Sequence, residues 1–131
     1  MRALGLDYGS KRIGVALGDT ASQVASPWCV LPHTSRGAAL DRLAAIIQQE
    51  AIDVLVVGIP FSLGQRQKEN GQMEEIRSFI VLLRERGWRV EEMDETLSSK
   101  MAAVFMKDRG ERGKRDDLAA AVILQSWLDK V

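Results

Sequence analysis

The chain has 131 residues, with 18 lysines and arginines, 18 aspartates and glutamates, one histidine and one cysteine. This length, with a hydrophobic content of 46%, predicts one globular domain over residues 1–131 and excludes a disordered or fibrous chain. The single cysteine excludes an intrachain disulfide, and no apolar run approaches the ~20 residues of a membrane span, so we expect a cytoplasmic, soluble protein without membrane contact.

Alternating apolar residues predict three strands at the beginning of the chain. Residues 2–8 alternate with a period of two, Gly9-Ser10 is typical of a turn, and residues 12–17 alternate again. A third, short strand is predicted over residues 28–31, after Pro27. We expect these three strands to pair as an antiparallel meander.

The middle of the chain alternates between helical and extended patterns. Apolar residues at helical spacing predict helices over residues 35–50 and 73–86. Between them, the segment DVLVVGIP is apolar on both faces, which is typical of a strand inside a parallel sheet. A fifth strand is predicted over residues 88–93.

Two further helices complete the prediction, one beginning near Ser98 and one over residues 116–130. The order of elements is therefore β-β-β-α-β-α-β-α-α. This order predicts an α/β fold in which helices flank a five-stranded mixed sheet, with the first strand at its centre and parallel strands after the meander.

Acidic residues occur where the predicted elements begin or end. Asp7 is the first of them, on the strand face that also carries Ala3 and Gly5. An ionised carboxylate on a central strand is costly unless a positive group meets it, and the small neighbours predict room for a metal or a phosphate. The alternative is a carboxylate that accepts hydrogen bonds from backbone N–H groups of the Gly9 turn.

Two acidic pairs follow later in the chain. Asp94 and Glu95 end the fifth strand on opposite faces, so only one can enter a shared site, and the alternative is that one caps the next helix. Asp116 and Asp117 open the last helix, where the helix dipole alone explains acids. Both lie near the buried stripe of that helix, and helical phase does not choose between them.

One acid from each cluster, brought together, would form a set of oxygen ligands. Such a set suits Mg²⁺ or Mn²⁺, whereas Zn²⁺ prefers histidine or cysteine. Two such ions activate water for phosphodiester hydrolysis. The carboxylates would repel one another without metal, so we expect metal to be needed for stability as well as for activity.

Basic residues form two candidate contacts for a phosphate backbone. Lys11 and Arg12 lie beside the turn that follows Asp7. The segment of residues 107–115 carries a charge of +3, from five cations and two anions. Its candidate contacts are Arg109, Arg112, Lys114 and Arg115. The alternative is an ordinary solvated loop, but the formal net charge of zero leaves such a local patch open.

Four motifs in order resemble one known family across nearly the whole chain. The segments LGLDYGSKRIGVALGD, VVGIPFSLG, MDETLSS and DDLAAAVILQSWLD are similar to those of the YqgF/RuvX family. This bacterial family has an RNase H-like fold, is related to Holliday-junction resolvases, and is described as processing the 5′ end of 16S ribosomal RNA precursor. The resemblance implies Asp7, Glu95 and Asp116 as the acidic residues of the site. Asp116 is chosen over Asp117 because the family's aspartate stands at this distance before a pair of small residues, here Ala119-Ala120.

The chain departs from the family pattern at two places. Thr96 stands where the family usually has an arginine after Asp-Glu, so a basic group beside the acidic site is missing. The segment after Pro60 also reaches Gly64 about one residue early, which affects the alignment of that loop. Neither departure removes an implied metal ligand.

These observations predict a metal-dependent nuclease that hydrolyses phosphodiester bonds and uses Mg²⁺ or Mn²⁺, and the family resemblance implies pre-16S rRNA as its substrate. Asp7, Glu95 and Asp116 would be both its catalytic residues and its metal ligands. The expected partner is nucleic acid, either RNA or branched DNA, and the expected assembly is a monomer or a homodimer. The alternatives are a Holliday-junction DNA resolvase and a ribosome-assembly factor that binds nucleic acid without cleaving it.

A further alternative is a nucleotide-binding lobe of the sugar-kinase and actin type. The spacing of Asp7, Gly9 and Gly14 resembles the phosphate loop of that fold. That architecture needs two lobes and a second phosphate motif, and 131 residues accommodate only one lobe. Turnover of ATP would support this alternative.

Overall fold

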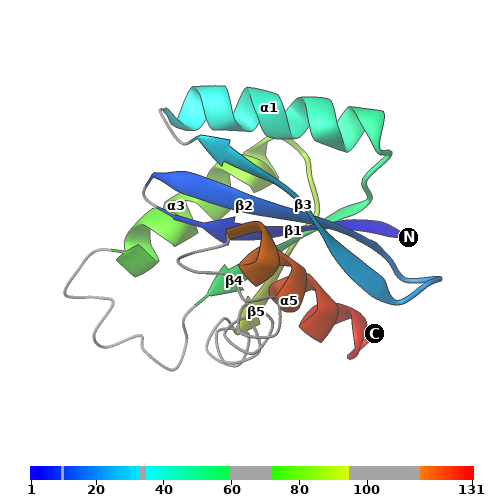
Figure 1. The fold of residues 1–131 in the computed structure, drawn as a ribbon. Coiled ribbons are helices and arrows are strands. Elements are labelled where there is room, and N and C mark those ends of the chain that lie inside the picture. Colours follow the sequence, from blue (N-terminus) through cyan, green and yellow to red (C-terminus); the bar gives the residue numbers. More distant parts are fainter. Residues whose placement is uncertain (10, 33–34, 60–71, 95–115) are drawn as a thin grey trace.

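A computed structural model describes residues 1–9, 11–32, 35–59, 72–94 and 116–131 (Figure 1). Its helices and strands, in chain order, are β1 (Arg2–Tyr8), β2 (Arg12–Asp19), β3 (Val24–Pro32), α1 (Arg36–Gln49), β4 (Val54–Ile59), α3 (Gln72–Glu85), β5 (Val90–Asp94) and α5 (Asp116–Leu128).

The five strands form one mixed sheet in the order β3-β2-β1-β4-β5. The first three pair antiparallel, whereas β4 and β5 run parallel to β1. This confirms the predicted meander, the parallel strands after it and the central position of the first strand. Every residue of β4 is buried, as expected of a parallel strand with both faces covered.

Helices cover both faces of the sheet and create two cores. On one face, α1 and α3 pack on the sheet to form what we call the α1–α3 core, built around Leu4, Leu6, Ile13, Val15, Leu43, Val57, Ile76 and Phe79. On the other face, the α5 core contains Ala3, Ala16, Val54, Val56, Met93, Ala120, Ile123, Leu124 and Trp127. Figure 1 shows α5 crossing in front of the sheet with α3 behind it.

The third strand begins at Val24, four residues before the predicted start. Pro27, after which the sequence predicts the strand to begin, lies within the strand opposite Ala16. A proline is tolerated there because β3 is an edge strand and Pro27 lies next to an irregularity in its pairing with β2. The prediction over residues 28–31 was therefore too short.

The other described elements differ from the predictions by a few residues at their ends. The second strand continues to Asp19, the fifth occupies residues 90–94 instead of 88–93, and α5 ends at Leu128 instead of at residue 130. The helix predicted near Ser98 lies outside the described residues. No described helix is long and apolar enough to cross a membrane.

Candidate functional site

Asp7 lies near the carboxyl end of the central strand, on the face of the sheet that α5 covers. Its side chain is half-buried. The alternation of β1 places it on the same face as Ala3, a member of the α5 core, and opposite Leu6 and Tyr8 of the α1–α3 core. The predicted position of this carboxylate on the face of Ala3 and Gly5 is confirmed.

Glycines stand beside Asp7 on both neighbouring strands. Gly14 of β2 is its partner in the antiparallel pair. On the other side, Gly58 follows Val57, which is the β4 partner of Leu6. No side chain therefore rises from the nearest position on either strand. Only the register between the strands places these glycines beside Asp7, and the periodicity of a single segment does not contain that register.

The space above Gly5 is occupied, contrary to the expectation that small neighbours of Asp7 leave room for a metal or phosphate. A Cβ atom at Gly5 would lie 2.7 Å from Leu124 Cβ and 2.8 Å from the carbonyl oxygen of Ala120. Gly5 is small because the backbone of α5 approaches the sheet at this point. The room next to Asp7 comes from Gly14 and Gly58 instead.

The same contacts fix the direction of α5 over the sheet. Gly5 meets Ala120 and Leu124, whereas Gly18 meets Leu124 and Leu128. Gly18 pairs with Ala3, near the start of β1. The helix therefore begins at the carboxyl end of β1 and runs toward its amino end.

This direction brings the first turn of α5 to the end of β1 that carries Asp7. Asp7 lies two residues beyond Gly5, which is about 7 Å along the strand. Asp116 lies one turn before Ala120, which is about 6 Å along the helix. Residues 7 and 116, which are 109 positions apart in the sequence, thus belong to the same edge of the molecule.

Asp117 is buried, with 9% of its surface exposed. Its carboxylate accepts a hydrogen bond of 3.0 Å from the N–H of Leu118. Burial raises the pKa of the Cys29 thiol, and the Asp117 carboxylate raises this pKa further, while Arg42 of α1 lowers it. Cys29 itself is partly buried against the α1–α3 core.

The second predicted acid, Glu95, lies outside the described residues. The strand before it ends at Asp94, which pairs with Ile59 at the end of β4. Because β1, β4 and β5 run parallel, their carboxyl ends meet at one edge of the sheet. Among the described side chains, no group of three or more histidines, cysteines, aspartates or glutamates is placed to hold a metal. Asp7 is the one predicted ligand whose side chain is described.

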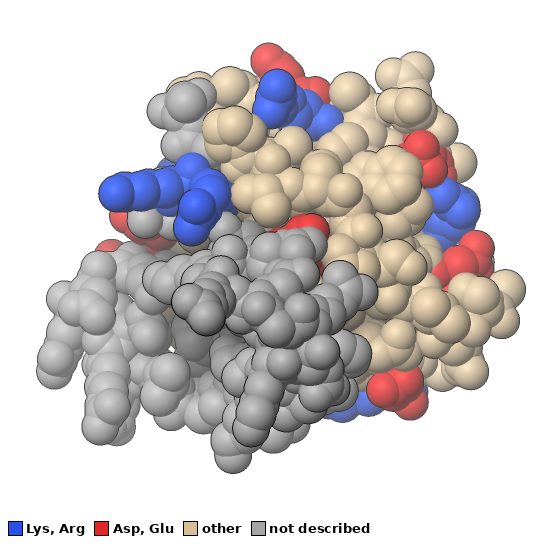
Figure 2. Space-filling view, in the orientation of Figure 1, with Lys and Arg blue, Asp and Glu red and all other residues tan. Residues whose placement is uncertain are grey.

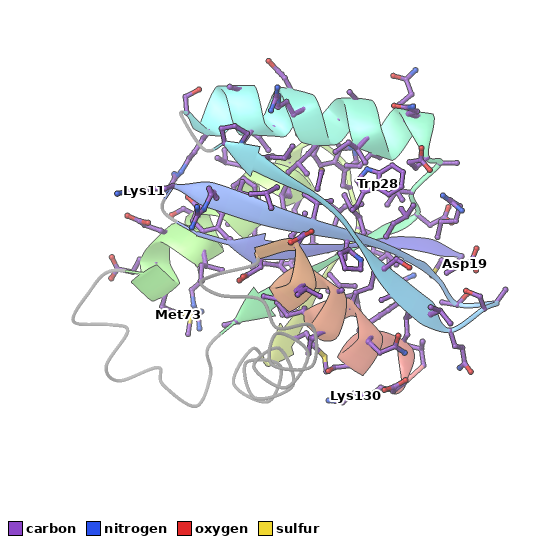
Figure 3. All side chains as sticks on the ribbon, in the orientation of Figure 1. Lys11, Asp19, Trp28, Met73 and Lys130 are labelled. Carbon is purple, nitrogen blue, oxygen red and sulfur yellow. The ribbon has the colours of Figure 1, made fainter. Side chains whose placement is uncertain are left out.

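Lys11 and Arg12 follow the turn that connects β1 to β2, and both are exposed. The Gly9 N–H donates a hydrogen bond of 2.9 Å to the carbonyl oxygen of Arg12, which closes the hairpin. In Figure 2 positive side chains are prominent on this side of the molecule, where Figure 3 labels Lys11. The predicted contacts Arg109, Arg112, Lys114 and Arg115 lie outside the described residues.

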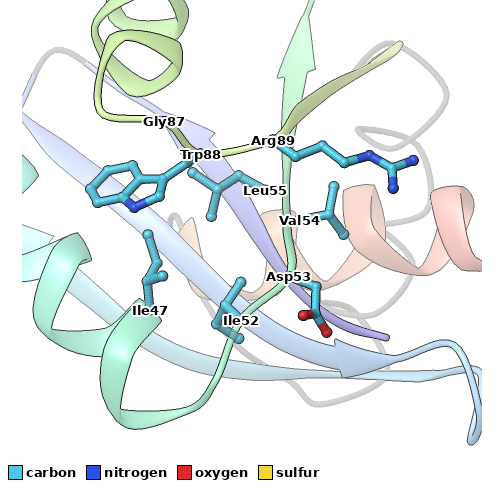
Figure 4. Close-up of a pocket in the computed structure, with 8 residues that line it drawn as sticks. All are labelled: Ile47, Ile52, Asp53, Val54, Leu55, Gly87, Trp88 and Arg89. Carbon is cyan, nitrogen blue, oxygen red and sulfur yellow. The ribbon is translucent and has the colours of Figure 1, made fainter.

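A pocket of about 270 Å³ lies at the opposite end of β4 (Figure 4). It is lined by Ile47, Ile52, Asp53, Val54, Leu55, Gly87, Trp88 and Arg89. The Asp53 carboxylate accepts a hydrogen bond of 2.8 Å from the Arg2 N–H, so it has a structural role at the start of β1. This pocket is separate from the Asp7 site.

Solved structures share this fold. The RuvC protein of T. thermophilus, solved in complex with a Holliday junction substrate, matches with a TM-score of 0.60 at 15% identity, covering 99% of this chain and 94% of that one. The yeast mitochondrial Holliday junction resolvase Ydc2 matches with a TM-score of 0.59 at 11% identity, covering 96% of this chain and 77% of that one. The fold is therefore RNase H-like, as predicted.

Related sequences identify the family. A protein of Anaeromyxobacter sp. (strain Fw109-5) named "Putative pre-16S rRNA nuclease" is 39% identical over 135 residues, covering 98% of this chain and 97% of its own. A Thermus thermophilus protein of the same name is 34% identical over 133 residues with the same coverage. The family model described as RuvX, Holliday junction resolvase, matches residues 1–130. The chain belongs to the RuvX Holliday junction resolvase family.

Proposed function

We propose that this chain is a metal-dependent nuclease that hydrolyses phosphodiester bonds in the 5′-end processing of pre-16S rRNA, as one domain over residues 1–131. The observation that carries the proposal is the meeting of Asp7 and the first turn of α5 at one edge of the sheet. The names of the relatives support RNA as the substrate. The family match over residues 1–130 supports one domain.

Asp7, Glu95 and Asp116 are the proposed ligands of one or two Mg²⁺ or Mn²⁺ ions. Met93 of β5 belongs to the α5 core, on the face of the sheet that carries Asp7. A set of carboxylate oxygens fits these ions. Bound divalent ions would supply an activated water and would neutralise charge that develops on the phosphate.

The chain's own groups would bind and orient the substrate strand. Lys11 and Arg12 are exposed beside Asp7, where they would contact phosphates that flank the cleaved bond. Arg109, Arg112, Lys114 and Arg115 are further proposed contacts. The glycines beside Asp7 would let the backbone of the substrate approach the carboxylate without meeting a side chain.

The test is cleavage of a 5′-extended pre-16S rRNA fragment, mapped to the nucleotide, with Mg²⁺, Mn²⁺ or EDTA. We expect Asp7→Asn to reduce the cleavage rate by roughly 100-fold or more and to leave RNA binding nearly unchanged. The control is Asp41→Asn, because Asp41 is an exposed acid on α1 whose ion pair with Arg86 measures 3.7 Å. Undiminished cleavage by Asp7→Asn would remove Asp7 from the mechanism.

Metal binding gives an independent measure of the same site. An ion that binds only the folded chain stabilises it by about 2.7 kcal/mol at a concentration 100-fold above its Kd. We therefore expect Mn²⁺ to raise the melting temperature of the intact chain and to have a much smaller effect on Asp7→Asn. Equal shifts in both proteins would contradict the proposed ligand.

A second candidate is a factor that binds RNA during ribosome assembly without cleaving it. Thr96 in place of the family's arginine and the formal net charge of zero favour it. RNA binding without any metal-dependent product would support this candidate. A four-way DNA junction in the same panel tests the resolvase activity that the family description names.

A further inference from the structure

Trp28 is an exposed aromatic residue at an irregular point of the edge strand β3. Its side chain is 48% exposed. Pro27 pairs with Ala16 and Cys29 pairs with Val15, so Trp28 is the extra residue of a β-bulge. Bulges redirect side chains and often lie next to functional sites. Nothing in the proposed mechanism uses this residue.

The pairing on either side of the bulge places Trp28 relative to Asp7. Cys29 and Leu31 pack in the α1–α3 core, so Val30 between them lies on the opposite face, which is the face of Asp7. Trp28 lies at the bulge itself, next to Pro27, which pairs with Ala16 of the α5 core. Val30 pairs with Gly14, and Gly14 pairs with Asp7. Asp7, Gly14 and Val30 therefore lie side by side on three adjacent strands, and Trp28 lies two residues before Val30 on β3.

These positions place Trp28 close to the proposed site. Two strand spacings separate β3 from β1, and Trp28 is offset from Val30 by two residues, so the Cα atoms of Trp28 and Asp7 are about 12 Å apart. A nucleic-acid strand that crosses the Asp7 site can reach this distance within a few nucleotides.

The helix α5 leaves Trp28 uncovered. It binds β3 nearer the start of that strand, where the Gln125 side chain accepts a hydrogen bond of 2.9 Å from the Ala25 N–H and donates one of 2.9 Å to the Gln23 carbonyl oxygen. Val30, beside Trp28, is also 38% exposed. Figure 3 shows Trp28 on the part of β3 that lies between α1 and α5 in this view.

We propose that Trp28 is a stacking platform for an unpaired base of the substrate strand. An indole ring stacks on any base, because every base has a π-face, and the contact requires no particular sequence. A base inside a duplex is already stacked and cannot use the ring, so Trp28 would favour single-stranded nucleic acid. This proposal rests on the proposed function, since Asp7 gives the strand its position.

The test is the binding of a fluorescently labelled single-stranded oligoribonucleotide in Mg²⁺, measured by anisotropy with full-length chains that also carry Asp7→Asn to prevent cleavage. Stacking predicts that Trp28→Ala weakens binding by roughly 5- to 150-fold and that Trp28→Phe retains most of the affinity. For blunt duplex RNA of the same sequence, we expect the effect of Trp28→Ala to be less than about twofold, because the duplex offers no free base.

Val24→Ala is the matched control. Val24 is 58% exposed on the same strand but pairs with Asp19, which pairs with Arg2 at the start of β1. It lies far from Asp7, so this variant should bind RNA like the parent chain. Abasic nucleotides are placed one at a time along the single-stranded oligoribonucleotide. One of these positions should weaken binding to the chain that retains Trp28, and the same position should have no further effect on binding to Trp28→Ala. Thermal melting of each variant checks that it is folded.

Three outcomes would overturn the proposal. The first is that Trp28→Ala binds single-stranded RNA as tightly as the parent chain, and the second is that no position of the abasic scan weakens binding. The third is that Trp28→Ala changes the mass of the protein in sedimentation but leaves RNA binding unchanged, which would show that a second copy of the chain covers β3. Cleavage is measured separately with Asp7 intact. Unchanged cleavage by Trp28→Ala would contradict the stacking proposal and leave the proposed nuclease function intact. Base-dependent binding without any cleavage would contradict the proposed nuclease function and leave the stacking proposal intact.

Discussion

Gly5 shows how a residue without a side chain positions the residues of the proposed site. The Ala120 carbonyl oxygen and Leu124 Cβ occupy the volume that any other residue at position 5 would need. Asp7 lies two positions along β1, and Asp116 lies one helical turn before Ala120. The distance between β1 and α5 therefore depends on the absence of one methyl group.

We predict that Gly5→Ala destabilises the fold by about 1–3 kcal/mol, because the added Cβ must displace the backbone of α5. It should also reduce cleavage, since the displacement moves α5 away from Asp7. Urea unfolding measures the first effect. The control is Gly37→Ala in α1, where a Cβ would meet nothing within 4 Å. We expect Gly37→Ala to be neutral or to stabilise the chain by up to about 1 kcal/mol, and an equal loss in both variants would contradict the packing argument.

At the scale of the element, α1 begins where a side chain replaces a missing hydrogen bond. The Ser35 hydroxyl accepts a hydrogen bond of 3.1 Å from the Ala38 N–H, which caps the first turn. The helix then buries Ala39, Leu40 and Leu43 against the sheet. The sequence predicted this helix to within one residue at each end, because its apolar spacing is a local signal.

We predict that Ser35→Ala costs about 1 kcal/mol of folding stability, because the N–H of Ala38 loses its acceptor. The loss should appear as a lower midpoint of urea unfolding with an unchanged slope. Ser22→Ala is the comparison, since the Ser22 hydroxyl contacts the Asp19 carbonyl oxygen at 3.4 Å outside any helix. Its effect should remain below about 0.5 kcal/mol, and a larger loss there than at Ser35 would refute the cap.

The whole molecule is electrically neutral by formal charge, so its affinity for a polyanion depends on where its cations lie. Lys11 and Lys130 are both exposed lysines, at different ends of the molecule in Figure 3. Lys11 lies beside the Asp7 site, whereas Lys130 follows the end of α5, which points away from that site. A neutral chain that binds RNA must do so through a local patch.

We predict that Lys11→Gln weakens RNA binding and reduces the slope of log affinity against log salt concentration by about 1, the value for one lost phosphate contact. Lys130→Gln should leave affinity and slope unchanged. Titrations between 50 and 200 mM salt provide the measurement. Equal effects of the two substitutions would mean that binding follows total charge and not the proposed surface.

Patterns within single segments determined most of the secondary structure, the mixed sheet and the family. Asp7 was found from the sequence because a carboxylate on an otherwise apolar strand is a local anomaly. Tertiary structure alone decided three features: the glycines on both sides of Asp7, the contact of α5 with Gly5, and the bulge at Trp28. The reason is physical, because strand register and helix docking depend on contacts between segments far apart in the sequence, such as Gly5 with Leu124, which the periodicity of one segment does not contain.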